Sequence, residues 1–169
     1  MEVFEAIFTR RSIRKYTDKQ VSTEIIEKIL KAAMYAPSAN NYQPWQFVVV
    51  NDRKILNEIP NVHPYSKMLY TASLAILICG DENYEKLPGY NAVNCSAATQ
   101  NLLLAAHACG LGTCWLGVYP REERMSEIKG FFKLPDNIIP ISLIAVGYPD
   151  EIKETPERFI PSRIHYNSW

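Results

Sequence analysis

The sequence has no excess of charge of either sign and no long apolar run. Lys and Arg total 18 and Asp and Glu total 18, so there is no surplus positive charge to attract nucleic acid or an anionic membrane surface. No stretch approaches the length that crosses a bilayer, and the first residues lack the regions of a secretory signal. We therefore expect a cytoplasmic protein that binds neither nucleic acid nor membranes.

The sequence also lacks the residue patterns of metal sites. The four cysteines, at positions 79, 95, 109 and 114, form no Cys-x-x-Cys pair and stand among apolar or small residues, which favours buried free thiols. The three histidines are far apart and do not have the spacing of metal ligands. We expect no bound metal.

The motifs by which side chains commonly perform catalysis are absent as well. There is no Gly-x-Gly-x-x-Gly after a strand, no Gly-Lys-Ser/Thr phosphate loop, no Gly-x-Ser-x-Gly and no convincing nucleophile and base pair. If the chain is an enzyme, its side chains are not the reagents. This favours a bound cofactor that carries the chemistry while the protein supplies position and charge.

What is present suits one domain of helices and strands, since the chain has 169 residues of which 47% are hydrophobic. Apolar positions three and four apart predict a helix that begins after Ser22 and ends before Pro37, and a longer helix over residues 90–109. An apolar run at 74–79 predicts a strand buried on both faces. Further short helices are expected near residues 3–8, 55–59, 65–70 and 122–132, and further strands at 45–50, 112–117 and 138–146.

The end of the chain has a different character. Residues after Pro149 have no helical period, and prolines interrupt them. They nevertheless include large apolar side chains, which a chain terminus cannot usually bury unless it is tied down. We expect residues 1–149 to form one domain and residues 150–169 to form an extension that packs on a second copy of the chain. These apolar side chains are Phe159, Ile160, Ile164, Tyr166 and Trp169.

The most distinctive local feature is the stretch Arg10-Arg11-Ser12-Ile13-Arg14-Lys15-Tyr16, which we call the arginine-rich segment. An arginine fork matches phosphate or carboxylate oxygens, so the segment is either an anion site or a solvated basic face. Arg10 and Arg11 also have a structural explanation, because they follow a short helix whose negative end attracts cations. The residues alone leave these alternatives open.

A phosphorylated planar cofactor would account for several features together. The arginine-rich segment could bind its phosphate, and Asn41 and Gln43 suit its heteroatom edge because amides both donate and accept. Trp45 or the extension could cover its rings, whereas Trp115 is interpreted as a core residue. Taken singly, each residue has a simpler structural role, so the combination makes a site plausible without naming the cofactor.

Three segments together resemble the nitroreductase family. They are the arginine-rich segment, Pro37-Ser38-Ala39-Asn40-Asn41-Tyr42-Gln43-Pro44-Trp45, and the run from Ala97 to Ala106 that continues into Gly110-Leu111-Gly112-Thr113-Cys114-Trp115-Leu116-Gly117. The resemblance covers nearly the whole chain, in order and at the spacing of the family.

The resemblance implies an α+β nitroreductase-like fold, with a central mixed, mostly antiparallel sheet flanked by helices. It implies an intertwined homodimer whose C-terminal tail extends over the partner, with FMN as the cofactor and NADH or NADPH as the co-substrate. The implied activity is reduction of nitroaromatics, quinones or related small acceptors by ping-pong hydride transfer through flavin N5. Reductive dehalogenation, flavin fragmentation, azoline oxidation, flavin storage and simple phosphoanion binding stay open as alternatives.

The resemblance also implies a site shared between two subunits, in which flavin N5 and no side chain is catalytic. Residues 10–14 would come from one subunit and residues 37–43 from the other. Lys67 would lie near flavin N1 and the C2 carbonyl, the backbone N–H near position 116 or 117 would face N5, and Arg163 would help to hold the phosphate. The implied FMN-binding residues are Arg10, Arg11, Ser12, Arg14, Pro37, Ser38, Ala39, Asn41, Gln43, Lys67, Leu116, Gly117 and Arg163.

The sequence departs from the family pattern at a few positions. Pro64 and Pro161 stand where members often carry a polar and a basic residue, so the resemblance leaves open whether these two positions contact FMN. The connection over residues 80–90 is short where many longer relatives insert a helical excursion. This predicts a more open or differently covered pocket, with Tyr84 and Tyr90 as candidate lid residues.

Overall fold

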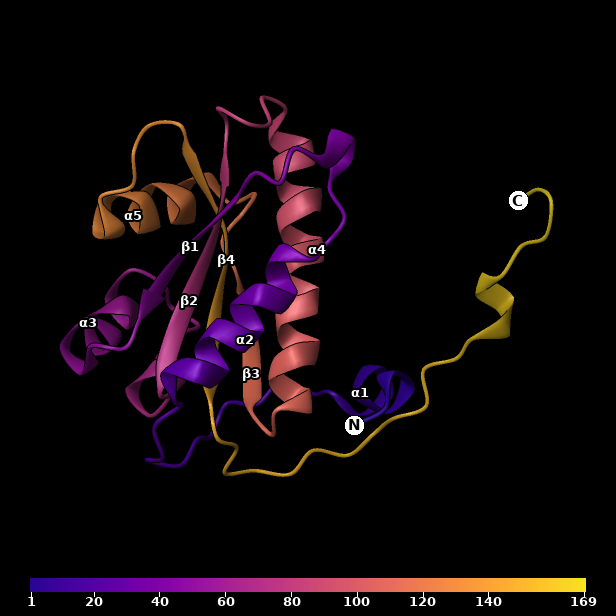
Figure 1. Cartoon of the computed structure of the whole chain (residues 1–169), viewed down its shortest axis with the longest axis horizontal. Helices are drawn as coiled ribbons and strands as arrows, with labels where there is room; N and C mark the ends of the chain where they lie inside the picture. Colours follow the sequence, from indigo (N-terminus) through magenta and orange to yellow (C-terminus); the bar gives the residue numbers. More distant parts are fainter.

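A four-stranded antiparallel sheet lies at the centre of the chain, and helices cover both of its faces (Figure 1). The computed structural model describes residues 1–169. None of its helices is both long and apolar enough to cross a membrane. The helices are α1 (Val3–Thr9), α2 (Thr23–Met34), α3 (Arg53–Glu58), α4 (Pro88–Ala108) and α5 (Glu122–Phe132). The strands are β1 (Trp45–Val50), β2 (Leu74–Asp81), β3 (Gly112–Gly117) and β4 (Ile138–Gly147), and short 3₁₀ turns cover Ala39–Asn41, Ile59–Asn61, Lys67–Tyr70 and Pro161–Arg163.

The strand order is β1-β2-β4-β3, so β2 and β4 are central. Every residue of these two strands is buried, as expected for apolar runs that are covered on both faces. All three strand pairs are antiparallel, and the expected mixed character is limited to one isolated parallel bridge between Ser12 and Thr113. That bridge places the arginine-rich segment beside β3, an edge strand of the sheet.

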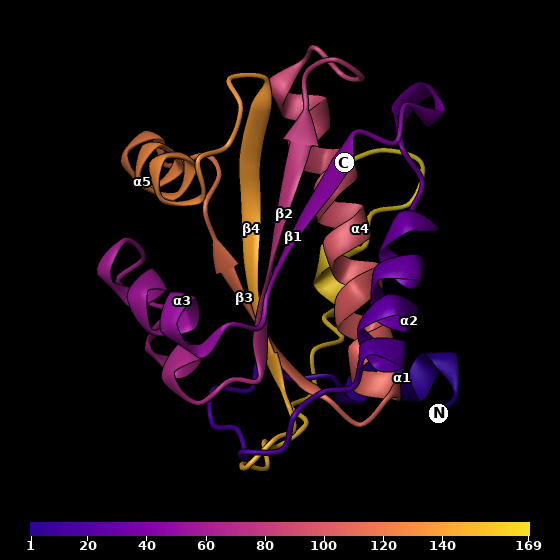
Figure 2. The ribbon, with the colours of Figure 1, turned by 60° about the vertical axis from the view of Figure 1, so that its left-hand side comes forward.

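The helices form one layer on each face of the sheet. Helices α2 and α4 cover one face, and α3 and α5 cover the other (Figure 2). On the first face Leu102 and Ala106 of α4 are fully buried in one cluster with Ile76 of β2, and on the second face Leu56 and Ile128 are fully buried. Burial of a leucine or isoleucine side chain contributes about 1.5–3 kcal/mol, so both layers hold the sheet, and with it β3, in place.

The helices and strands expected from apolar periodicity are confirmed, with changes at their ends. Helix α4 begins at Pro88, two residues earlier than expected, because proline is favoured in the first turn of a helix. Asp52 caps α3 by accepting hydrogen bonds from the backbone N–H of Lys54 at 2.7 Å and of Ile55 at 3.3 Å. Within residues 65–70 only Lys67–Tyr70 is helical, as a 3₁₀ turn.

The tryptophans and one cysteine differ from their expected surroundings. Trp115 was expected in the core and is 37% exposed, because alternate side chains of a strand face opposite sides of the sheet. Trp45 is 7% exposed and belongs to the apolar core, so it does not form an open platform for a cofactor. All four cysteines are free thiols; three are buried, and Cys109 is half-buried.

Two apolar segments project from this fold without cover. In α1, Phe4 and Phe8 are exposed and stack at a centroid distance of 5.9 Å. The extension over residues 150–169 runs past α1 and away from the domain (Figure 1), and Phe159 and Trp169 are 70% and 100% exposed. The chain itself does not bury either segment. That the extension packs on a second copy stays a prediction.

Candidate functional site

A cavity of about 510 Å³ lies beside β3. Its wall includes four of the expected cofactor residues, Arg14, Lys67, Leu116 and Gly117. They come from three separate parts of the chain: the arginine-rich segment, a 3₁₀ turn and the end of β3. The fold therefore brings together residues that are about fifty positions apart in sequence. The rest of the wall consists of His63, Pro64, Tyr65, Met68, Cys114, Trp115 and Arg124.

Backbone contacts hold the arginine-rich segment against β3. The Ile13 N–H donates to the Thr113 carbonyl at 2.9 Å, and the Ile13 side chain is buried. Gly112 permits this approach, because a Cβ at that position would lie 2.8 Å from side-chain atoms of Ile13. Any larger residue at position 112 would push the segment away from the strand and disturb one wall of the cavity.

Arg14 and Lys67 line the cavity as cations without acidic partners. The Glu151 carboxylate accepts the backbone N–H groups of Arg14 at 2.5 Å and Lys15 at 3.2 Å. A hydrogen bond from Lys153 is the main cause that lowers the pKa of Glu151, and the Arg14 N–H is the next. The single ion pair of the chain joins Lys153 to Glu151 at 2.7 Å. The Arg14 guanidinium and the Lys67 ammonium thus keep all their donors for an anion.

Arg10 and Arg11 use their guanidiniums differently. Arg11 donates to the carbonyls of Phe8 at 2.6 Å, Arg10 at 2.5 Å and Glu154 at 3.0 Å, and so joins the end of α1 to the extension. The half-buried Arg10 guanidinium has no acceptor in the chain, and burial, followed by repulsion from Arg11, lowers its pKa. A partly buried cation without a partner favours an anionic ligand. In this chain Arg10 is therefore free to bind an anion, whereas Arg11 is engaged.

The loop over residues 37–43 lies far from the cavity in the same chain. It adjoins the start of α4, whereas residues 10–14 lie near the end of that helix (Figure 1); α4 has 21 residues and is therefore about 30 Å long. Ser38 Oγ accepts the Gln43 N–H at 3.0 Å, and Asn41 Oδ1 accepts from Gln43 Nε2 at 2.8 Å. One chain alone does not unite the two expected halves of the site.

Asn94, which was not predicted as a site residue, supports the loop over residues 37–43. Asn94 of α4 is buried, and its Oδ1 accepts the Ala39 N–H at 3.0 Å. Its Nδ2 has no partner, which is uncommon for a buried polar group. An asparagine among the apolar residues of a predicted helix was the available signal. Arg163 lies in the projecting extension and is not among the residues of the cavity wall.

Two further residues that were not predicted from the sequence, His63 and Arg124, contact the Gly117 carbonyl. His63 is 1% exposed and its Nε2 lies 3.2 Å from that oxygen; since a carbonyl only accepts, Nε2 carries the proton. Burial is the main cause that lowers the pKa of His63, and its Nδ1 has no partner. Arg124 Nη1 donates to the same oxygen at 2.7 Å. The carbonyl is therefore held from two sides, by a neutral imidazole and a guanidinium.

The cavity has the chemistry of a site for a planar, phosphorylated cofactor. Arg14 and Lys67 offer free cationic donors, and the half-exposed Trp115 offers apolar surface. No atom of the chain outside residues 116–118 lies within 4 Å of the position that a Cβ on Gly117 would take, so the backbone at the end of β3 is open to a ligand. No group of three or more His, Cys, Asp or Glu side chains is placed to hold a metal ion.

Comparisons with known proteins agree with this geometry. The nitroreductase family model matches residues 7–63 and 57–148. A protein of Methanothermobacter thermautotrophicus, provisionally named NADH dehydrogenase/NAD(P)H nitroreductase, is 52% identical over 169 residues, which are 100% of this chain and 88% of that protein. The solved structure of an FMN-dependent nitroreductase from Clostridium difficile has a TM-score of 0.90 and 32% identity, and covers 98% of this chain and 99% of its own. A provisionally assigned nitroreductase from Desulfovibrio desulfuricans, solved in complex with FMN, has a TM-score of 0.86 and 30% identity, over 100% of this chain and 98% of its own.

Proposed function

Because the chain belongs to the nitroreductase family, we propose that it is an FMN-dependent NAD(P)H oxidoreductase that reduces nitroaromatics, quinones or related small acceptors. The observation that carries the proposal is the cavity beside β3, where cations without acidic partners face an open strand end. The FMN named for relatives, whose chains this one covers almost completely, has a phosphate and a planar ring that match these two features. Bound FMN would supply the transfer of two electrons between nicotinamide and acceptor.

The residues of this chain would hold and orient that cofactor. Arg10 and Arg14, with Ser12 between them, are the donors for the phosphate and the ribityl chain, because both guanidiniums lack partners in the chain. Lys67 would place a positive charge beside the pyrimidine edge and offset negative charge there. The backbone N–H at Leu116 or Gly117 would donate to N5, a task that needs a fixed backbone and no particular side chain.

The uncovered apolar segments support a homodimer as part of the proposal. Phe4 and Phe8 of α1 and Phe159 of the extension are all exposed, and exposed apolar surface of this extent marks an interaction site. A second copy would cover them and would bring its residues 37–43 and its Arg163 to the cavity of the first. The remoteness of these residues from the cavity within one chain is what such a shared site requires. The expected cytoplasmic location stays a prediction.

A single cavity explains how the enzyme can work without a separate dinucleotide-binding motif. Reduced nicotinamide would dock at the open face of the cavity and leave before the acceptor enters the same place, so both substrates would use the same residues. The exposed side chains of Tyr65 and Trp115 would provide the flat surface against which either planar substrate can lie.

The test is the colour of the purified protein. We expect a yellow dimer that binds FMN and loses its colour anaerobically on addition of NADH or NADPH. A protein that keeps its colour with both nucleotides would be a flavin-binding protein without this activity. A colourless protein that does not take up added FMN would contradict the proposal as a whole.

A further inference from the structure

We infer that Arg124 forms a subsite of the cavity that binds a carboxylate or phosphate group of the substrate. The inference rests on the proposed function, because Arg14 and Lys67, the other cations of the cavity wall, are there assigned to the cofactor. Arg124 is then the cation that is left for a substrate. It lies in the first turn of α5, which begins at Glu122.

The guanidinium of Arg124 is fixed in the cavity wall by two contacts. Its Nη1 donates to the Gly117 carbonyl at 2.7 Å, and its Cζ lies 5.4 Å from the centroid of the Tyr65 ring. The same carbonyl accepts from the buried His63, and the His63 and Tyr65 rings meet edge to face at 6.4 Å. A guanidinium held in this way loses little conformational freedom when it binds a ligand.

The free edge of the guanidinium has the shape that an oxyanion requires. Arg124 Nη1 is used by the carbonyl, whereas Nε and Nη2 donate to no atom of the chain. Nε–H and the adjacent Nη2–H point in the same direction, and this pair matches the two oxygens of a carboxylate or phosphate. The edge that recognises oxyanions is therefore the edge that the fold leaves open.

The charge on the wall of the cavity beside β3 also favours an anionic ligand. Glu122, Glu123 and Glu127 of the same helix share the wall of a second, neighbouring cavity with Arg124, yet none of them forms an ion pair with it within 4.0 Å. The cavity wall contains Arg14, Lys67 and Arg124 and no carboxylate. Arg124 binds the carbonyl of Gly117, so the subsite lies beside the backbone that is proposed to face flavin N5.

This position defines the class of substrate. The subsite suits a planar molecule with its reducible group over the cofactor and an anionic group at its rim, next to the Tyr65 ring. The anion has two possible sources. One is a carboxylate on the electron acceptor, and the other is the 2′-phosphate that distinguishes NADPH from NADH.

Binding of 4-nitrobenzoate and of neutral 4-nitrobenzyl alcohol to the FMN-loaded dimer tests the subsite. Arg124→Gln removes the charge, Arg124→Lys keeps the charge without the fork, and Arg121→Gln removes an exposed arginine outside this cavity wall as the matched control. Calorimetric titration should show roughly 10- to 150-fold weaker binding of 4-nitrobenzoate to Arg124→Gln, the size expected for one charge-assisted contact. The neutral alcohol should bind every variant with nearly wild-type affinity, because His63 still holds the Gly117 carbonyl when Arg124 is replaced. Arg124→Lys should recover only part of the affinity for 4-nitrobenzoate.

The same variants test whether the anion is the 2′-phosphate of NADPH. A KM for NADPH that rises in Arg124→Gln while the KM for NADH does not would assign the anion to the 2′-phosphate. Equal affinities of wild type and Arg124→Gln for 4-nitrobenzoate, together with unchanged KM values for both nucleotides, would overturn the subsite. The titration needs no turnover, so a dimer that binds the anion through Arg124 but does not oxidise NAD(P)H would refute the proposed activity and leave the subsite standing.

Discussion

Lys67→Met separates the proposed cofactor-binding role of Lys67 from any structural role. The Lys67 ammonium is exposed and has neither an ion pair nor a hydrogen-bond acceptor in the chain. Loss of such a surface side chain changes the free energy of unfolding by no more than about 0.5 kcal/mol. A hydrogen bond to a charged group contributes about 1.5–3 kcal/mol, so loss of the proposed contact between Lys67 and FMN should weaken FMN binding by roughly 10- to 150-fold.

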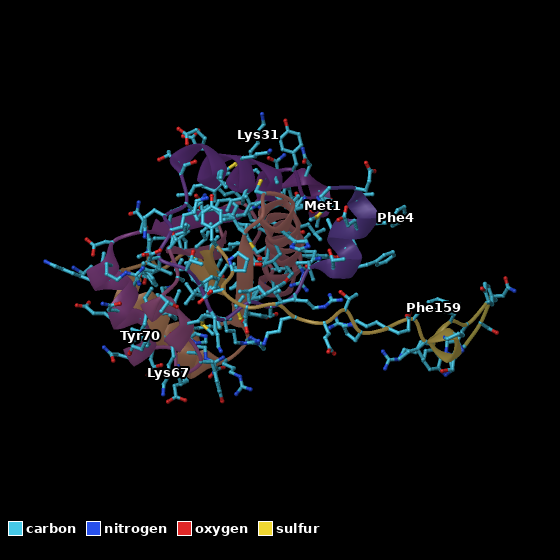
Figure 3. All side chains as sticks on the ribbon, turned by 90° about the horizontal axis from the view of Figure 1, so that it is seen from below. Met1, Phe4, Lys31, Lys67, Tyr70 and Phe159 are labelled. Atoms are coloured by element: carbon cyan, nitrogen blue, oxygen red, sulfur yellow. The ribbon has the colours of Figure 1, made fainter.

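The assay pairs two measurements on the apoprotein, the FMN dissociation constant from quenching of flavin fluorescence and the urea midpoint of unfolding. Lys31→Met is the matched control, because Lys31 is an exposed lysine of α2 on the opposite side of the molecule (Figure 3). We expect Lys67→Met to lose FMN affinity with an unchanged midpoint, and Lys31→Met to change neither. FMN affinity within twofold of wild type in Lys67→Met would refute the assignment of this lysine to the cofactor.

Three other predictions concern Gly112, His63 and the extension over residues 150–169. Gly112→Ala should destabilise the chain by about 1–3 kcal/mol, because the new Cβ would meet Ile13 at 2.8 Å; a melting temperature equal to wild type would contradict the packing described. Burial lowers the pKa of His63, so the unfolded chain binds a proton that the folded chain excludes, and stability should fall as the pH drops below about 6.5. His63→Gln keeps a donor for the Gly117 carbonyl. Urea unfolding at pH 7.5 and at pH 5 should show a smaller loss of stability on acidification in this variant than in wild type. His107, whose pKa burial also lowers, contributes to the loss that remains. Deletion of the residues after Pro149 should weaken the dimer and release FMN, and a truncated protein that sediments as a yellow dimer would show that the extension has no such role.

The sequence predicts the elements well because their signals are local. The three- and four-residue spacing of apolar side chains defines α2 and α4, and the apolar runs at 74–79 and 138–146 define the two central strands. Tertiary packing, which local spacing does not report, decides the remaining details. Trp115 illustrates this, since its exposure depends on which face of an edge strand it occupies.

The candidate site is predictable only in part. The resemblance identified Arg14, Lys67, Leu116 and Gly117, and the fold brings these four together. It could not identify Arg124, because an arginine in the first turn of an amphipathic helix has the pattern of an ordinary solvated residue. Its contact with Gly117 spans seven positions and a change of secondary structure.

The missed histidine and asparagine have the same explanation. His63 is a lone histidine without metal-ligand spacing, and its contact with Gly117 spans 54 positions. Asn94 supports Ala39 across 55 positions. The loop over residues 37–43 and Arg163 raise a different difficulty, because their expected place in the site depends on a second chain.

The central claim is that this cavity holds FMN between two chains and passes electrons from NAD(P)H to a small acceptor. Anaerobic titration of the FMN-loaded dimer with NADPH or NADH, followed by addition of a quinone, tests it most directly when the visible spectrum is recorded throughout. We predict that about one equivalent of nucleotide per flavin removes the yellow absorbance and that the quinone restores it. A flavin spectrum that neither nucleotide changes would contradict the claim.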